Sequence, residues 1–222
     1  MKIGVFDSGI GGKTIADALE LVFPEDEIIY RNDHEHVPYG SRTAKEVERL
    51  TLNAVRPLVE IGCGIIVIAC NTATTNAIEA LRSTYPEVFF VGLEPMIKPA
   101  ARLSKTKIIS ICATPATLQS AGYERLKETW AHGMRVIEPD CSSWATLIEH
   151  GRAEEIPVKE VVEQLTAAQC DVIVLACTHY HWLKNRFAAA ASGITILEPT
   201  DAIAERVAHL KQDYNAFTAV IN

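Results

Sequence analysis

The stretch GCGIIVIACNTA at residues 62–73 is matched 107 residues later by QCDVIVLACTHY at residues 169–180. In both, a short apolar run rich in β-branched residues ends on a thiol, Cys70 or Cys177, and polar side chains follow at once. A continuous apolar run of this length is typical of a parallel strand that is buried on both faces. The two stretches therefore predict two equivalent buried strands, each ending in a cysteine.

A second pair of stretches supports an internal repeat. KIGVFDSGIGG from Lys2 aligns with KIISICATPAT from Lys107 at an offset of 105, close to the offset of the first pair and in the same order along the chain. Such a pattern predicts a duplicated half. We expect an α/β fold of two pseudo-symmetric lobes with mainly parallel sheets, one formed by residues 1–93 and 199–222 and the other by residues 94–198, with the active site in the cleft between them.

Short β-branched runs alternate with helical patterns along the whole chain, as expected of parallel sheets with crossover helices. Thr43 to Glu46 form a capping box ahead of an apolar pattern that runs to about Ile61. Thr114 is the expected N-cap of another helix, with Pro115 at its first position. Strands are expected at about 2–6, 27–31, 64–69, 88–92, 107–111, 134–138, 171–176 and 194–197.

Composition and charge exclude several classes of protein. The 222 residues are 48% hydrophobic and 22% charged, as in an ordinary globular protein, and the net charge is −7. Without a dense run of lysine and arginine, a nucleic-acid partner is not expected. Asp7 interrupts the apolar start too early for a signal peptide, and no apolar stretch approaches the roughly 20 residues of a membrane span. We therefore expect a cytoplasmic protein that contacts no membrane.

The six cysteines show no C-x-x-C spacing, which argues against a zinc or redox motif. Most of them are expected to be small buried core residues, since cysteine is among the most frequently buried residue types. Cys63, Cys112 and Cys170 fit that description, and Cys141 has no assigned role. Cys70 and Cys177 differ because each lies at the carboxyl end of a predicted strand, where open parallel sheets bind their ligands.

Two equivalent thiols suggest proton transfer between opposed groups. Inverting a carbon that bears hydrogen requires a base on one face and an acid on the other, and a thiol near a helix N-terminus or a cation can serve as either close to neutral pH. A single catalytic cysteine would instead suggest covalent acyl transfer. The pairing of Cys70 with Cys177 therefore favours an inversion of configuration.

Four motifs in order, GVFDSGIGG, VPYGSRT, ACNTA and LACTHY, resemble those of glutamate racemases in the aspartate/glutamate racemase superfamily. VGLEPMIKPA also resembles a segment of that family, and the resemblance covers residues 1 to about 207. It implies an isomerase that needs no cofactor and no metal and that converts L-glutamate to D-glutamate for peptidoglycan, with glutamate as its small-molecule partner. A homodimer is left open.

The resemblance also implies roles for individual residues. Cys70 is similar to the family's base for the D-isomer, and Cys177 to its base for the L-isomer. The residues implied to assist catalysis beside these thiols are Asp7, His179 and Glu149. The residues implied to bind the substrate are Asp7, Ser8, Tyr39, Gly40, Asn71, Thr72, Thr117, Thr178 and His179.

Each of these residues also has a purely structural interpretation. Asp7 and Ser8 are suited to capping a helix that begins near Gly11, and Tyr39 with Gly40 to forming a turn. His179 is suited to capping its own helix. Glu149 reads equally well as a solvated carboxylate at a helix end.

Other functions are less consistent with the residues. GIGG is not a dinucleotide loop because Thr14 occupies the position of the third glycine. No second aspartate lies near FDSG for aspartyl-phosphate chemistry, and no Schiff-base lysine is identifiable for a pyridoxal enzyme. The closest alternatives are an aspartate racemase, in which Cys-Thr-Glu is common where this chain has His179, and a catalytically silent amino-acid-binding relative.

Overall fold

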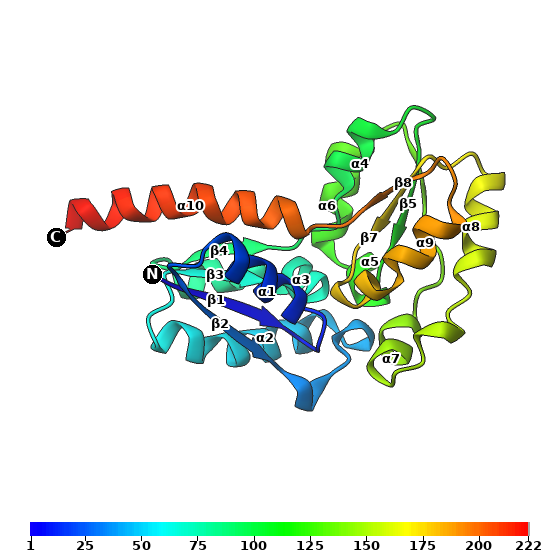
Figure 1. The fold of residues 1–222 in the computed structure, drawn as a ribbon. Helices are drawn as coiled ribbons and strands as arrows, with labels where there is room; N and C mark the ends of the chain where they lie inside the picture. Colours follow the sequence, from blue (N-terminus) through cyan, green and yellow to red (C-terminus); the bar gives the residue numbers. More distant parts are fainter. Residues whose placement is uncertain (222) are drawn as a thin grey trace. The chain divides into compact units, whose positions relative to one another are not determined.

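A computed structural model describes the backbone of residues 1–221 and the side chains of residues 1–200 and 202–214. The chain divides into two compact units (Figure 1). The first unit contains Met1–Val37, Thr43–Leu93 and the chain from Pro199 onward, and the second contains Pro38–Arg42 and Glu94–Glu198. The short segment Pro38–Arg42 thus belongs with the second unit, although it precedes most of the first in sequence.

The first unit is a parallel sheet with strand order β2-β1-β3-β4. Its helices connect the strands as crossovers, as the alternating pattern predicts. Its elements are β1 (Lys2–Asp7), α1 (Lys13–Val22), β2 (Glu27–Asn32), η1 (His34–His36), α2 (Ala44–Glu60), β3 (Ile65–Ile68), α3 (Asn71–Thr84), β4 (Phe89–Gly92) and α10 (Thr200–Ile221).

The second unit repeats this topology, with a parallel sheet of order β6-β5-β7-β8. All the expected strands are present in the described chain, with bounds within one residue of those predicted. The elements are η2 (Tyr39–Ser41), α4 (Ile97–Leu103), β5 (Ile108–Cys112), α5 (Pro115–Leu118), α6 (Ala121–Trp130), β6 (Arg135–Ile137), α7 (Trp144–Glu149), η3 (Ala153–Glu155), α8 (Val158–Ala167), β7 (Val172–Leu175), η4 (Thr178–Leu183), α9 (Lys184–Ala190) and β8 (Thr195–Leu197).

The strand registers correct one detail of the predicted repeat. Ile3 of β1 pairs with Ile65 of β3, and Ile109 of β5 pairs with Val172 of β7. Ile65 and Val172 are 107 residues apart, as expected, but Ile3 and Ile109 are 106 apart, so the predicted offset of 105 for the first strand was wrong by one. A shift of one residue reverses which face a side chain points to, and the structure therefore matches Ser8 with Thr114.

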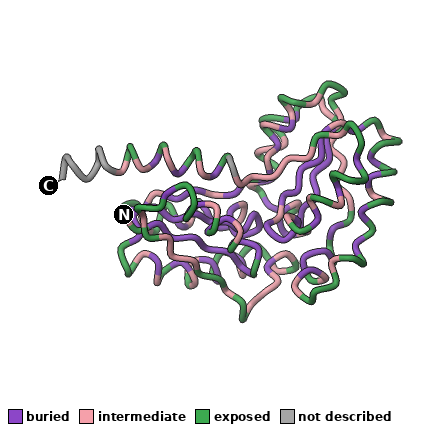
Figure 2. Tube along the Cα trace, in the orientation of Figure 1, coloured by how far each residue is buried: buried purple, intermediate pink, exposed green. Residues whose placement is uncertain are grey.

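Each sheet is covered by helices on both faces. In the first unit, Val5 and Val67 pack against α1 and α10; α2 and α3 contact the sheet strands and each other. In the second unit, Ile111 and Val174 pack against α4 and α6, and Ile173 packs on the opposite face against α7, α8 and α9. Figure 2 shows the central strands as buried, and these are the strands that end beside the two thiols.

Two predicted helix starts are confirmed by their hydrogen bonds. The Thr43 hydroxyl accepts from the Glu46 N–H, and the Glu46 carboxylate accepts from the Thr43 N–H, which is the predicted capping box. The Thr114 side chain caps α5, whose first residue is Pro115. Among the described residues, no helix is long and apolar enough to cross a membrane.

Candidate active site

Cys70 lies at the N-terminus of α3, a helix of 14 residues in the first unit. It follows β3 directly and is the N-cap residue of α3, so the Ala73 N–H points at its sulfur at 3.4 Å. The Ser8 hydroxyl, just beyond the neighbouring strand β1, lies 3.2 Å from the same sulfur. An amide donor, a hydroxyl and the positive end of the helix dipole together stabilise negative charge on Cys70.

Asp7 is fully buried at the end of β1 and organises the loop that leads to α1. Its carboxylate accepts from the Gly9 N–H at 3.1 Å and from the Gly12 N–H at 3.0 Å. A β-carbon on Gly12 would lie 2.4 Å from the β-carbon of Asp7, so only glycine allows this approach. The N-cap residue of α1 is Gly12, which makes no side-chain capping bond of its own, and the Asp7 carboxylate binds its N–H from the end of β1. The Ser8 side chain instead lies beside Cys70.

Asn71 and Thr72 open α3 beside Cys70, and both are buried. Neither the amide nitrogen nor the amide oxygen of the Asn71 side chain has a hydrogen-bond partner within the described part of the molecule. Leaving a buried amide unsatisfied costs about 1–3 kcal/mol. Its position next to a polarised thiol makes Asn71 a candidate for binding a polar ligand.

Cys177 is surrounded differently in the second unit. It has extended backbone angles after β7, is followed by a 3-10 helix, and makes no side-chain capping bond. Its sulfur lies 3.6 Å from Nδ1 of His179, and Nε2 of His179 lies 2.5 Å from the Glu149 carboxylate. This order, thiol to imidazole to carboxylate, allows His179 to exchange a proton with Cys177 while Glu149 orients the ring.

The His179–Glu149 pair is buried. The His179 side chain is 5% exposed and the Glu149 side chain 9% exposed. Glu149 is therefore not the solvated carboxylate at a helix end that the sequence alone allowed. Thr178, between the thiol and the imidazole, is also buried.

Tyr39, Gly40 and Thr117 form a third group together with Thr114, which the sequence predicts only as a helix cap. Tyr39 lies in a 3-10 turn and is only 1% exposed, so its side chain is buried instead of lying on the surface. A β-carbon on Gly40 would lie 2.8 Å from the β-carbon of Thr114, and the Thr114 hydroxyl lies 3.0 Å from that of Thr117. The alignment of Ser8 with Thr114, correct only at an offset of 106, is the signal that would have identified Thr114 as a candidate.

The remaining thiols behave as core residues. Cys63 and Cys170 lie before β3 and β7, and burial raises the pKa of each thiol to about 11. Cys112 and Cys141 are fully buried in the core of the second unit, and a hydrogen bond with Cys112 followed by burial raises the pKa of Cys141 further. Of the six cysteines, only Cys177 is partly exposed.

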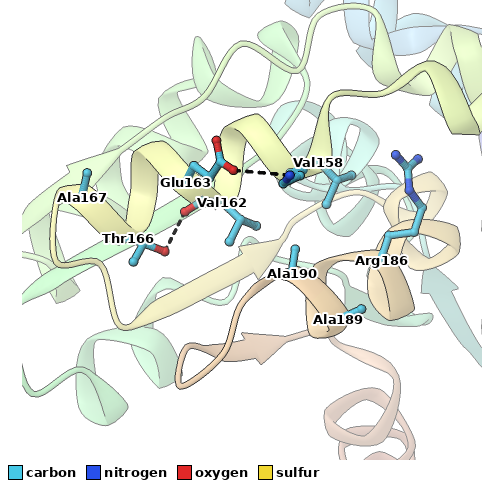
Figure 3. Close-up of a pocket in the computed structure, with 9 residues that line it drawn as sticks. Val158, Val162, Glu163, Thr166, Ala167, Arg186, Ala189 and Ala190 are labelled. Carbon is cyan, nitrogen blue, oxygen red and sulfur yellow. Dashed lines mark hydrogen bonds and ion pairs between the residues drawn. The ribbon is translucent and has the colours of Figure 1, made fainter.

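A shallow groove elsewhere in the second unit contains none of the predicted site residues. Figure 3 shows side chains of α8 and α9 facing one another across it. Arg186 at its edge is already bonded to the Ala153 and Ile156 carbonyls. The lining residues are Val158, Lys159, Val162, Glu163, Thr166, Ala167, Arg186, Ala189 and Ala190. With mostly apolar lining and no polarised thiol, this groove is not suited to proton transfer.

Comparison with known proteins decides the family. The model of the family described as Asp/Glu/Hydantoin racemase matches residues 13–207. The chain belongs to this racemase family. A glutamate racemase from Roseiflexus is 36% identical over 216 residues, covering 95% of this chain and 79% of the relative. One from Aquifex aeolicus is 36% identical over 209 residues, covering 92% of this chain and 81% of the relative.

Solved structures agree with this membership of the racemase family. The Escherichia coli glutamate racemase in complex with L-glutamate and the activator UDP-MurNAc-ala has a TM-score of 0.82 at 28% identity, covering 94% of this chain and 81% of the other. The Francisella tularensis enzyme in complex with D-glutamate also has a TM-score of 0.82, at 25% identity, with 96% and 82% covered. The resemblance predicted from the motifs, the fold class and the enzyme class of amino-acid racemase are confirmed.

Proposed function

We propose that this protein is a glutamate racemase that uses Cys70 and Cys177 as its two acid–base groups, with no cofactor and no metal. The observation that carries the proposal is the repetition itself: equivalent central strands of the two sheets, β3 and β7, each end beside a thiol with its own polar support. Glutamate is favoured over aspartate because the relatives matched over most of this chain are named glutamate racemases.

The proposed reaction consists of two proton transfers. With L-glutamate, the Cys177 thiolate removes the α-hydrogen as a proton, and the electron pair left on the α-carbon is delocalised into the substrate carboxylate. The Cys70 thiol then donates its proton to the opposite face, which gives D-glutamate and leaves Cys70 as the thiolate. The reverse reaction exchanges the two roles, so each thiol must be accessible in both protonation states.

The groups beside each thiol support this exchange. At Cys70, the Ala73 N–H and the Ser8 hydroxyl stabilise the thiolate that forms when the proton leaves. At Cys177, His179 takes up or returns a proton while Glu149 stabilises its charged form. Asp7 keeps the loop after β1 in place so that Ser8 reaches the sulfur.

The substrate is held by polar groups near the strand ends. Hydroxyls, the amide nitrogen of Asn71 and backbone N–H groups can donate to the two carboxylates, and hydroxyl, amide and carboxylate oxygens can accept from the ammonium group; the unsatisfied Asn71 amide supports this assignment most directly. The proposed binding residues are Asp7, Ser8, Tyr39, Gly40, Asn71, Thr72, Thr114, Thr117, Thr178 and His179. We also infer that the enzyme works in the cytoplasm and supplies D-glutamate for peptidoglycan.

The test is a circular dichroism assay of the purified protein with single amino acids and no added cofactor. The ellipticity of L-glutamate should decay to zero, and that of D-glutamate should decay to the same value, because the two enantiomers are equally stable. L-aspartate is the matched control, since it is one methylene shorter, and it should decay far more slowly. A faster decay of aspartate would reassign the substrate, and no decay of any amino acid would refute the racemase.

A further inference from the structure

Tyr180 follows His179 directly and has no role in the proposed reaction. It is completely buried, and its ring contacts the edge of Trp144, with ring centroids 5.2 Å apart. Its hydroxyl donates to the Cys141 carbonyl at 3.1 Å, and its N–H donates to the Cys177 carbonyl at 3.0 Å. Tyr180 is thus bonded both to the segment that carries Cys177 and to the segment that leads into α7.

The Cys141 carbonyl marks the start of the short helix that carries Glu149. It accepts from the Trp144 N–H at 3.2 Å, and Trp144 is the first residue of α7. Glu149 is the last residue of that helix. The 3-10 helix with the thiol is therefore joined to α7 at both of its ends: by the Tyr180 hydroxyl at the beginning and by the His179–Glu149 bond at the end.

Hydrogen bonds at both ends of a helix restrict its orientation more than a bond at one end does. Helix α7 has only six residues, and a helix this short is not stable without tertiary contacts. Removing the Tyr180 hydroxyl would take away the hydrogen bond at the beginning of α7 and leave the His179–Glu149 bond at its end and the packing of its buried side chains. A displacement of about 1 Å at a catalytic group is enough to slow a reaction about a hundredfold.

We propose that Tyr180 is a positioning residue for the Cys177 half of the reaction, acting by holding α7 so that Glu149 reaches His179. Burial raises the pKa of the Tyr180 hydroxyl well above its ordinary value, so the hydroxyl stays protonated and remains a donor throughout the working pH range. The proposal rests on the proposed function, because it assigns Tyr180 to one of the two proton transfers.

The test replaces Tyr180 by phenylalanine, which keeps the ring and removes the hydroxyl. The readout is the elimination of a leaving group from the β-carbon of L- and D-glutamate analogues, in which one thiolate takes the α-proton, the leaving group departs with its electron pair, and the product hydrolyses to a 2-oxo acid. In Tyr180→Phe, elimination from the L-analogue should fall about tenfold, the effect of one hydrogen bond, while the D-analogue reacts at the wild-type rate.

Tyr123→Phe is the matched control. Tyr123 is also completely buried in the second unit, and its hydroxyl donates to the Glu138 carboxylate at 2.6 Å, far along the sequence from the thiol segment. Its loss should leave both eliminations unchanged. Trp144→Phe, which preserves the hydroxyl bond and removes part of the ring contact, should slow only the L-analogue, and by less than Tyr180→Phe does.

An effect of Tyr180→Phe on both enantiomers, on neither, or equal to that of Tyr123→Phe would overturn the proposal. A second readout needs no substrate: the rate of alkylation of Cys177 and Cys70 at one pH, followed by mass spectrometry of the full-length protein. In Tyr180→Phe, alkylation of Cys177 should slow, because His179 is no longer held in place to accept its proton, and that of Cys70 should not change. If the wild-type protein racemises nothing but this slowing occurs, the proposed function fails and the positioning role of Tyr180 stands.

Discussion

The two thiols lie at equivalent strand ends, but their surroundings have diverged. Cys70 caps a helix of 14 residues and is stabilised by fixed groups, the Ala73 N–H and the Ser8 hydroxyl, which do not titrate near neutral pH. Cys177 precedes a 3-10 helix and depends on the ionisable pair His179 and Glu149. The duplicated half therefore preserved the position of the thiol and changed the means of polarising it.

The two thiols of a racemase can differ in their surroundings in this way without a difference between the rates of the two directions. The equilibrium constant between enantiomers is unity, so kcat/KM must be the same in both directions, whichever thiol is impaired. A defect confined to one thiol is therefore invisible in the ratio of the two racemisation efficiencies. It becomes visible only in a half-reaction that uses one base, such as elimination from an analogue of a single enantiomer.

Replacing either thiol should have the largest effect. Cys70→Ser and Cys177→Ser should each lower racemisation at least about a thousandfold, because a serine hydroxyl is too weak an acid to become the base. Cys70→Ser should retain elimination from the L-analogue, and Cys177→Ser should retain elimination from the D-analogue. The measurement is the initial rate of 2-oxo acid release for each variant with each analogue.

Cys63→Ser, at a core thiol equivalent to Cys170, is the control and should retain racemisation. Full racemase activity in either active-site variant would show that the cysteines are not opposed bases. So would the same enantiomer preference in both variants. In deuterated water, the wild-type enzyme should incorporate deuterium mainly into the product enantiomer, since in the proposed reaction each thiol protonates one face only.

Altering the support of one thiol should have a smaller and one-sided effect. Glu149→Gln preserves the shape of the side chain but removes the charge that stabilises protonated His179, so elimination from the L-analogue should fall about a hundredfold. Ser8→Ala removes one hydroxyl from Cys70 and should slow the D-analogue about tenfold. Rates measured over a range of pH should show a changed profile in Glu149→Gln and an unchanged profile in Ser8→Ala. Equal losses for both enantiomers in either variant would contradict the asymmetry.

The sequence predicted the strands well because their signal is local. Every central strand is a short run of apolar residues that ends at a polar cluster, and the Thr43 capping box depends on residues three apart. The pairing of strands is not local. The predicted repeat was misaligned by one residue because KIGVFD and KIISIC share their first two residues at an offset of 105, whereas the strands are equivalent at an offset of 106. That error concealed the equivalence of Ser8 and Thr114.

The support of Cys177 was less accessible from sequence alone. Glu149 and His179 are 30 residues apart, and nothing in the helix around Glu149 distinguishes a buried carboxylate from a solvated one. Only the resemblance to the racemases suggested the pair. Tyr180 was similarly hidden, because its bond to the Cys141 carbonyl spans 39 residues and involves a backbone atom, which leaves no trace in residue types.

The two units also differ in the groups that bind one partly buried carboxylate in each of them. In the first unit, Asp26 is bonded to the Lys211 ammonium of α10 and to the N-terminal amine. In the second, Asp171 accepts from the Ser104 hydroxyl at 2.6 Å and from the backbone N–H of Lys105 at 2.6 Å. Both of these donors are neutral. For both, burial alone would raise the pKa, but these partners outweigh it and the pKa lies below its ordinary value of 3.8.

The smallest expected effect is a difference in how salt changes the stability lost on replacing each of these two carboxylates. A carboxylate whose pKa is lowered by folding stabilises the protein above its unfolded pKa, and that stability is lost as the pH falls through the lowered folded pKa. Asp26→Asn and Asp171→Asn should therefore each reduce the free energy of unfolding by about 1 kcal/mol at neutral pH, and both differences should shrink in acid. In about 1 M salt, the cost of Asp26→Asn should diminish because the ion pairs are screened, whereas that of Asp171→Asn should persist because bonds to neutral donors are not. Denaturant unfolding at two salt concentrations measures both, and an equal salt dependence would show that the two units do not differ in this way.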